Sequence, residues 1–387
     1  MKKSLLALAA MGAFAGAAHA QSSVTVYGIL DVGFNSFSTD TTDSAGAKTT
    51  AAISSTGKTN NYTTSRLGFR GTEDLGKGLK AGFNIEVGMA QNDQANSNAA
   101  SGPNAAQSTN VDSNYGNVVS PFVLRQSNVS LSGGFGTITL GRQTTAVEAA
   151  WGTGDIGGAN NFIGRAYTFG PTIGTTSTGY SAGKQNHDRS DRLITYTTPN
   201  MSGFVASVQY GQGKNDAYTS ASLGNQQSEM GASLSYSAGP LQVTAGYLNE
   251  KSTVSGTNII NGQPQQLVLG ANYDFKVAKA FLSLSSGSNK TAADVKSNQR
   301  DLYELGVSVP LGAIVLNASA LMGSYTPVDG GDKGKVSGMQ LGALYNLSKR
   351  TMAYGVYGQD KVTDLTAANA NTEVSRSNFG IGVRHTF

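Results

Sequence analysis

The chain has 387 residues and a formal net charge of +4, and only 13% of its residues are charged, against roughly 25% in ordinary soluble domains. It contains 50 glycines, nearly double the usual share, and no cysteine. The lack of cysteine excludes disulfides, zinc–thiolate sites and cysteine nucleophiles, and the small net charge excludes the strongly basic surface typical of nucleic-acid binding.

The first 20 residues predict a secretory signal peptide. A basic start with two lysines is followed by the apolar run Ser4–Ala18 and by Ala18-His19-Ala20, which has the small-x-small pattern of a cleavage site. Cleavage after Ala20 leaves residues 21–387. No later stretch approaches 18 consecutive apolar residues, so we expect no transmembrane helix. Two classes remain, a secreted β-rich soluble protein and an outer-membrane β-barrel.

The first segments after the signal peptide alternate in the manner of half-buried strands. In Val24–Phe34 the even positions are mostly apolar and the odd positions more polar. Residues 36–62 are rich in Ser, Thr, Asn and Gly, which predicts a loop. The next strand is predicted at Thr64–Thr72, where Arg66 and Arg70 lie on the face opposite the large apolar side chains.

The same rhythm continues to the end of the chain, with short turns and long polar loops in alternation. An even count of about sixteen strands arranged in this way is typical of a transmembrane antiparallel β-barrel of the outer membrane. Closure of the sheet removes exposed edges, which lipid does not tolerate. The predicted fold class is therefore all-β. The remaining strands are predicted at residues 79–91, 122–133, 136–143, 191–198, 203–211, 227–237, 240–250, 265–276, 279–289, 300–309, 312–325, 336–346, 350–360 and 377–387.

The connection over residues 144–190 is much longer than most connections in compact domains, and such a length is typical of a functional or disordered segment. It carries the only tryptophan, Trp151, several other aromatic residues, and a turn-prone acidic stretch that begins at Asp155. We therefore expect this third external loop to fold into the lumen of the barrel and to narrow the pore.

Aromatic residues indicate the membrane interfaces. The last strand alternates between apolar and polar positions and ends at Phe387, which we place in an interfacial girdle. The same placement is predicted for tyrosines that lie in or near the ends or walls of strands, with a sugar-guiding track in the pore as the less favoured alternative. These are Tyr27, Tyr196, Tyr210, Tyr236, Tyr247, Tyr273, Tyr345 and Tyr354.

Five segments resemble the general porins of Gram-negative bacteria, of the β-proteobacterial type, and they occur in the expected order along the chain. The resemblance implies a homotrimer of sixteen-stranded barrels in outer-membrane lipid and lipopolysaccharide, and passive diffusion of small hydrophilic solutes and ions. It also implies that Phe387 is a terminal signal read by the barrel-assembly machinery. The segments are Gln21–Asp31, Ser65–Gly76, Leu131–Arg142, Tyr345–Thr351 and Gly380–Phe387.

The resemblance also implies a pore constriction in which arginines of the wall face acidic groups on or near the inward loop. By position in the family's motifs, the arginines are Arg66, Arg125 and Arg189. The acidic side is Glu86 on the wall and Asp155 in the loop, the latter placed by approximate spacing. Such a constriction implies a weak preference for anions.

Physical chemistry supports arginine in this role, because a guanidinium stays charged at any working pH and rings of basic side chains favour anions. The alternation of the strands places Arg66 and Arg189 on polar faces, towards the lumen. Arg125 shares its face with Val129, so a bulge or a covered wall is needed to bring it into the pore. For Arg142 a contact between subunits is as plausible as a pore role.

Three alternatives to a general porin remain: a solute-specific porin, a barrel enzyme and a surface adhesin. The chain carries no hydrolase elbow motif and no cluster with metal-ligand spacing, so we expect no catalysis, cofactor or metal. A porin predicts ion conductance without turnover, an enzyme predicts turnover that depends on His187, and an adhesin predicts cell binding that depends on the long loops.

Overall fold

The computed structural model describes residues 23–89, 122–156, 189–215, 225–254, 265–290, 296–326, 333–363 and 373–387. The signal segment 1–20 and His187 lie outside these ranges. The described residues form one antiparallel sheet and one helix, α2 (Ala146–Gly154), and no helix among them is long and apolar enough to cross a membrane. The strands are β1 (Ser23–Thr42), β2 (Lys48–Thr59), β3 (Arg66–Gly76), β4 (Leu79–Met89), β5 (Phe122–Gly133), β6 (Gly136–Thr144), β7 (Arg189–Thr197), β8 (Phe204–Asn215), β9 (Asn225–Ala238), β10 (Leu241–Val254), β11 (Gln265–Asp274), β12 (Lys279–Lys290), β13 (Lys296–Leu311), β14 (Ile314–Thr326), β15 (Gly334–Asn346), β16 (Thr351–Thr363) and β17 (Glu373–Thr386).

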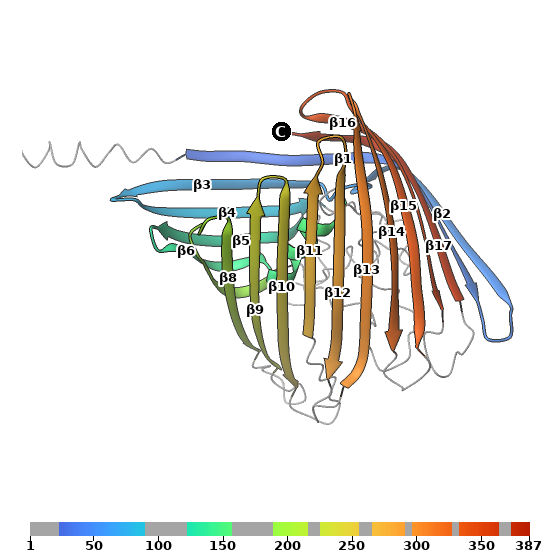
Figure 1. Ribbon diagram of the computed structural model, residues 1–387, viewed down its shortest axis with the longest axis horizontal. Coiled ribbons are helices and arrows are strands. Elements are labelled where there is room, and N and C mark those ends of the chain that lie inside the picture. The colour runs from blue at the N-terminus through green and yellow to red at the C-terminus, as the bar shows by residue number, and fades with distance from the viewer. Residues whose placement is uncertain are drawn as a thin grey trace, which may run out of the picture.

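The sheet closes on itself because β1 pairs with β17 along Ile29–Thr42, and β1 also pairs with β3 over Ser23–Ile29. From β3 to β17 each strand pairs with the next, so sixteen strands complete the circuit (Figure 1). The predicted closed antiparallel barrel of about sixteen strands is confirmed.

The seventeenth strand, β2, is an addition that the sequence did not predict. The prediction of a loop over 36–62 was wrong, because β1 continues to Thr42 and forms a hairpin with β2. Within it, β2 pairs with the half of β1 that β3 leaves unpaired. Polar Ser and Thr side chains are compatible with a strand wherever the pairing, rather than apolar burial, stabilises the segment.

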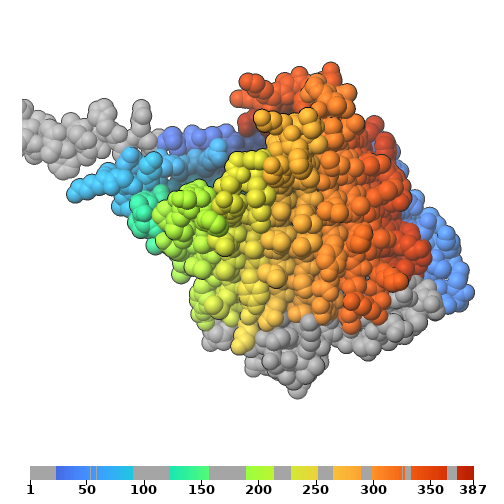
Figure 2. Space-filling view, in the orientation of Figure 1, coloured from blue at the N-terminus to red at the C-terminus, as the bar shows by residue number. Residues whose placement is uncertain are grey.

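The polarity of the barrel is inverted relative to a soluble protein. Large apolar side chains such as Val129, Leu234 and Leu305 are at least half exposed on the outer face, while polar side chains on the opposite face are buried. Figure 2 shows the continuous outer wall that the later strands form, from yellow to red. An apolar outer face and a polar interior are the pattern of a barrel that spans a membrane.

Short turns and long connections alternate as predicted. The β3–β4, β5–β6, β9–β10 and β13–β14 hairpins each close with two residues, and the β9–β10 turn lies at the upper rim in Figure 1. The connections β4–β5 and β6–β7, which leave the opposite ends of the strands, are much longer. One rim of the barrel therefore has short turns, and the other carries the long connections.

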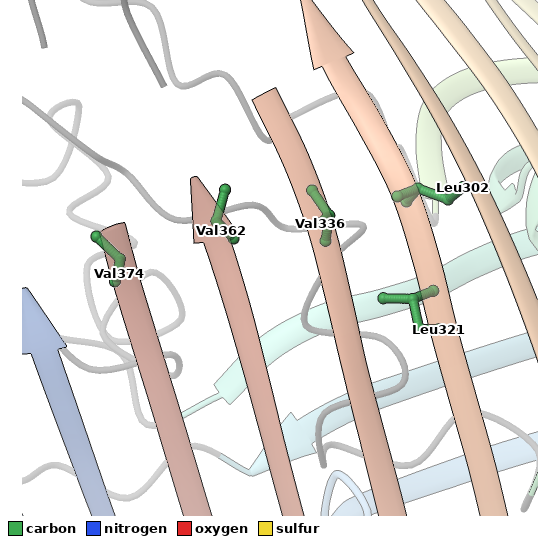
Figure 3. Close-up of a cluster of buried hydrophobic side chains, with 5 residues drawn as sticks. All are labelled: Leu302, Leu321, Val336, Val362 and Val374. Atoms are coloured by element: carbon green, nitrogen blue, oxygen red, sulfur yellow. The ribbon is translucent and has the colours of Figure 1, made fainter. Parts of the chain in front are cut away.

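An apolar cluster interrupts the polar interior near the long connections. Five aliphatic side chains from consecutive strands β13–β17 lie beside one another and are 1–7% exposed (Figure 3). Burial of one aliphatic side chain stabilises a fold by roughly 1.5–3 kcal/mol, so this cluster fixes the wall at the rim where turns are long. Its members are Leu302, Leu321, Val336, Val362 and Val374.

Candidate pore constriction

The centre of the site is Glu86, a buried carboxylate on the inner face of β4. Its Oε1 accepts a hydrogen bond from Arg125 Nε at 2.6 Å and lies 3.9 Å from Arg66 Nη1. Glu86 is 4% exposed, and its neighbour Ile85 is 44% exposed on the outer face. Two guanidinium groups around one carboxylate leave a net positive charge on this part of the lumen wall.

The backbone explains how both arginines reach the lumen. Arg66 pairs with Gly88 and Gly68 pairs with Glu86, so the alternation of β3 places Arg66 on the same face as Glu86. In β5 the pairing jumps from Gln126 to Leu124, which leaves Arg125 as the extra residue of a β-bulge. A bulge re-aims a side chain in this way. It reconciles Arg125 with the outward Val129, and it is one of the two explanations that the sequence left open.

Tyr27 adds a hydroxyl to the same cluster, which contradicts its predicted place in an aromatic girdle. Its Oη donates to Asn84 Oδ1 at 3.0 Å and lies 3.1 Å from Glu86 Oε2. The Arg70 guanidinium lies 5.2 Å from the centre of its ring. Tyr27 therefore links three polar side chains of the lumen, those of Asn84, Glu86 and Arg70. In the sequence nothing distinguishes Tyr27 from the tyrosines that face outward.

The other tyrosines divide in the same way. Tyr354 is 5% exposed and faces inward, so its predicted girdle position was also wrong. Five others are 38–49% exposed, like the apolar side chains of the outer face: Tyr196, Tyr210, Tyr247, Tyr273 and Tyr345.

Arg189 lies elsewhere on the wall, and the alternation that placed it in the lumen does not hold. It opens β7, four wall positions along the sheet from β3, and pairs with Thr144. Asp191 and Arg192 form a bulge, and Arg192 has a φ of 59°. Because of this bulge, the inward and outward positions before it do not follow the alternation that begins at Leu193. As a result Ser190 bonds the inward carboxylate of Glu229.

Asp155 ends helix α2, and α2 packs on the inner face of the barrel. Thr145 caps the start of the helix by accepting from the Glu148 N–H at 3.4 Å. Val147, Ala150 and Trp151 pack against Leu248 of β10 and Val268 of β11. Asp155 is 3% exposed and lies close enough to Glu304 on β13 for electrostatic interaction. Helix α2, in the first part of the segment 144–190, thus lies inside the barrel, and residues 157–188 are outside the described ranges.

Two glycines let α2 approach the wall this closely. A Cβ added at Gly270 would lie 1.9 Å from the Ala150 carbonyl oxygen, and one at Gly246 would lie 2.3 Å from the Ala146 oxygen. Hydrogen bonds hold the end of the helix, with Asn272 Nδ2 donating to the Thr153 oxygen at 2.8 Å. The position of α2 on the wall therefore depends on close contact between the helix backbone and the glycines of β10 and β11. The pattern of hydrophobic residues in the sequence does not reveal such a contact.

The wall beside the first turn of α2 is polar and uncharged. A cavity of about 270 Å³ lies there. Hydroxyl and carboxamide side chains of β5–β8 line it, among them Gln126, Asn128, Thr139, Gln143, Thr195 and Gln209. Groups of this kind hydrogen-bond water, so this part of the lumen is suited to hydrated solutes.

Arg142 and Phe387 occupy the outer face and the junction of the barrel. Arg142 pairs in register with the exposed Ser127, and its Nη1 lies 3.0 Å from Asp191 Oδ1. Phe387 is 48% exposed, and its N–H and C=O exchange hydrogen bonds of 3.1 and 3.0 Å with Gly28. The last residue thus extends the seam between the two ends of the chain.

Comparison with known proteins agrees with this architecture. A family model described as Gram-negative porin matches residues 7–365. The chain is 33% identical to outer membrane porin protein 32 of Delftia acidovorans and 31% identical to an outer membrane porin protein of Bordetella pertussis, in both cases over all of both chains.

Solved structures agree as well. A structure described as an anion-selective porin from Comamonas acidovorans superposes with a TM-score of 0.66 at 29% identity, over 95% of this chain and all of that one. OmpT of Vibrio cholerae, at 15% identity and a TM-score of 0.59, shares the fold. The family is one of channels rather than enzymes, and the chain is an outer-membrane protein that belongs to the Gram-negative porin family.

Proposed function

We propose that the barrel is a water-filled channel through which small hydrophilic solutes and ions diffuse passively, with a weak preference for anions. The observation that carries the proposal is the cluster on the inner wall, where Arg66 and Arg125 surround the single carboxylate of Glu86. A net positive charge on a lumen wall lowers the energy of an anion and raises that of a cation. The similar solved structure of a porin from Comamonas acidovorans, which is described as anion-selective, supports the same preference.

We further propose that the segment 144–190 constricts the pore. The position of α2 on the inner face supports this, because a helix there occupies volume that would otherwise be open lumen. In this proposal Asp155, at the end of α2, is the acidic group of the inward segment and moderates the anion preference. Arg189 belongs to the same proposal as a basic group at the start of β7, outside the Glu86 cluster.

A single-channel recording in a planar bilayer under a salt gradient tests the proposal. We expect stepwise conductance, with a reversal potential that favours anions over cations. Steps in groups of three would support a homotrimer. A reversal potential that favours cations would contradict the role of the arginines, and a folded barrel without conductance would contradict the channel itself.

The remaining proposals concern assembly. We propose cleavage after Ala20, insertion by the barrel-assembly machinery, and contact of the outer face with lipid and lipopolysaccharide. The exposed apolar outer face supports the contact with lipid.

Removal of Phe387 is expected to reduce the yield of folded barrel in the outer membrane. Its two backbone hydrogen bonds to Gly28 continue the β1–β17 seam, and its ring lies on the outer face against Gly28. The measurement is the fraction of protein that migrates as folded barrel without heating, with Phe387→Tyr as a matched aromatic control. An equal yield for the truncated and full-length chains would contradict this role.

A further inference from the structure

The turn Asn60–Ser65, which joins β2 to β3, folds into the barrel although the strand before it, β2, is largely exposed. Asn61, Tyr62, Thr63 and Ser65 are at most 6% exposed. Asn60 has a φ of 61°, in the left-handed region, which turns the chain inward. A polar six-residue turn buried in this way must satisfy its backbone groups locally.

Asp31 on β1 supplies most of those partners. Its Oδ2 accepts the N–H groups of Thr63 at 2.8 Å and Tyr62 at 3.2 Å, and its Oδ1 accepts the Tyr354 hydroxyl at 2.7 Å. Its backbone N–H donates to Ser65 Oγ at 3.0 Å. Asp31 is fully buried, and a buried carboxylate is costly unless it is hydrogen-bonded as it is here.

The turn has two further attachments to the wall. Asn61 Nδ2 donates to the Phe34 oxygen at 3.0 Å, beside Gly33, where a Cβ would lie 2.7 Å from that nitrogen. The Tyr62 ring packs on the Tyr354 ring with centroids 5.1 Å apart. Tyr354 therefore contacts both the Asp31 carboxylate, through its hydroxyl, and the Tyr62 side chain of the turn, through its ring.

The turn leads directly into the Glu86 cluster. Ser65 precedes Arg66, and the Met89 N–H donates to the Ser65 oxygen at 2.8 Å. Asn60 Nδ2 donates to the Met89 oxygen at 2.8 Å, and Met89 ends the strand that carries Glu86. Any movement of the turn would therefore change the position of Arg66 relative to Glu86.

We propose that Asp31 is a positioning residue of the pore, which holds the turn Asn60–Ser65 inward and thereby keeps Arg66 beside Glu86. The proposal rests on the proposed function, because it explains how one of the selectivity-determining arginines is held. Asp31 itself lies under the turn and is closed to passing ions.

The sign of the selectivity change distinguishes positioning from a direct electrostatic effect. Loss of the Asp31 charge alone would make the interior more positive and would strengthen the anion preference. If Asp31 positions Arg66, Asp31→Asn weakens the anion preference instead, because the carboxamide cannot accept all three hydrogen bonds and the turn is released. We expect the ratio of anion to cation permeability to fall at least twofold in the salt-gradient recording.

A second measurement reports on the turn itself. The chain has no cysteine, so Thr63→Cys introduces a single thiol at a position that is 6% exposed. In the reconstituted barrel we expect this thiol to react slowly with a membrane-impermeant thiol reagent, and at least tenfold faster when Asp31→Asn is added. Tyr354→Phe, which removes one hydrogen bond and keeps the ring, should give a smaller increase in the same direction.

Asp360→Asn is the matched control, because Asp360 is also a buried inward carboxylate but pairs with Arg376 away from the turn. It should leave the thiol at position 63 protected and should not weaken the anion preference. A protected thiol in the Asp31→Asn barrel would overturn the proposal, and so would a stronger anion preference. If Asp31→Asn does not fold, Tyr354→Phe provides both readouts. Failure of the arginines themselves would appear separately, as unchanged selectivity after their replacement, while thiol exposure still reports on the turn.

Discussion

Replacement of Arg66 and Arg125 by serine is expected to convert the preference of the channel from anions to cations. Both guanidiniums lie on the inner wall around Glu86, and their removal leaves that carboxylate without either of them, while Arg70 stays beside Tyr27. A unit charge about 7 Å from an ion is worth about 0.6 kcal/mol in water. Because each of the two charges acts on anions and cations in opposite directions, the difference amounts to about 2.4 kcal/mol, and the permeability ratio should change by roughly fiftyfold before screening by salt.

The change should depend on salt concentration. The Debye length is about 10 Å at 0.1 M salt and about 3 Å at 1 M, so the shift in reversal potential should be large at low salt and small at high salt. Arg142→Ser is the matched control, because Arg142 lies in register with the outward face and pairs with Asp191. An unchanged reversal potential in the double variant at low salt would remove both arginines from the constriction.

The barrel wall was predictable because its physical cause is local. A strand between lipid and water needs apolar side chains at every second position, and that period is visible without any knowledge of the partner strands. The two-residue turns were equally visible as Gly133–Gly136 and Ala238-Gly-Pro240. Alternation alone predicted that Arg66 faces the lumen. In the structure Arg66 lies 3.9 Å from Glu86, and no bulge separates the pairing of Arg66 with Gly88 from that of Gly68 with Glu86.

The same alternation fails wherever a bulge adds a residue. In β5 a bulge brings Arg125 into the lumen, and in β7 a bulge removes the basis for placing Arg189 there. A bulge is defined by how a strand pairs with its neighbour, so it cannot be predicted from the sequence of one strand alone. The turn Asn60–Ser65 was hidden for a related reason. Its composition is that of an exposed loop, and only the distant Asp31 and Tyr354 make its burial favourable.

Replacement of Gly270 by valine is expected to lower the single-channel conductance. The Cβ of any side chain at this position would lie 1.9 Å from the Ala150 oxygen and 2.8 Å from the Gly154 nitrogen, both of which are helix backbone. The wall strand β11 is paired on both sides and is the less movable partner. Helix α2 must therefore shift away from the wall, towards the axis of the pore, where it obstructs the lumen.

The same shift separates Val147 and Trp151 from Leu248 and Val268, and overpacking of this kind costs about 1–3 kcal/mol. The temperature at which the folded barrel is lost on a gel should therefore fall together with the conductance. Gly355→Val is the matched control, because it makes the same change in a strand where the nearest atom to an added Cβ is a side-chain carbon at 3.8 Å. If the Gly270 variant conducts like the control, the close contact between α2 and β11 does not set the width of the pore. A lower conductance in the Gly270 variant alone would show that a single glycine of the wall determines how far the inward segment projects.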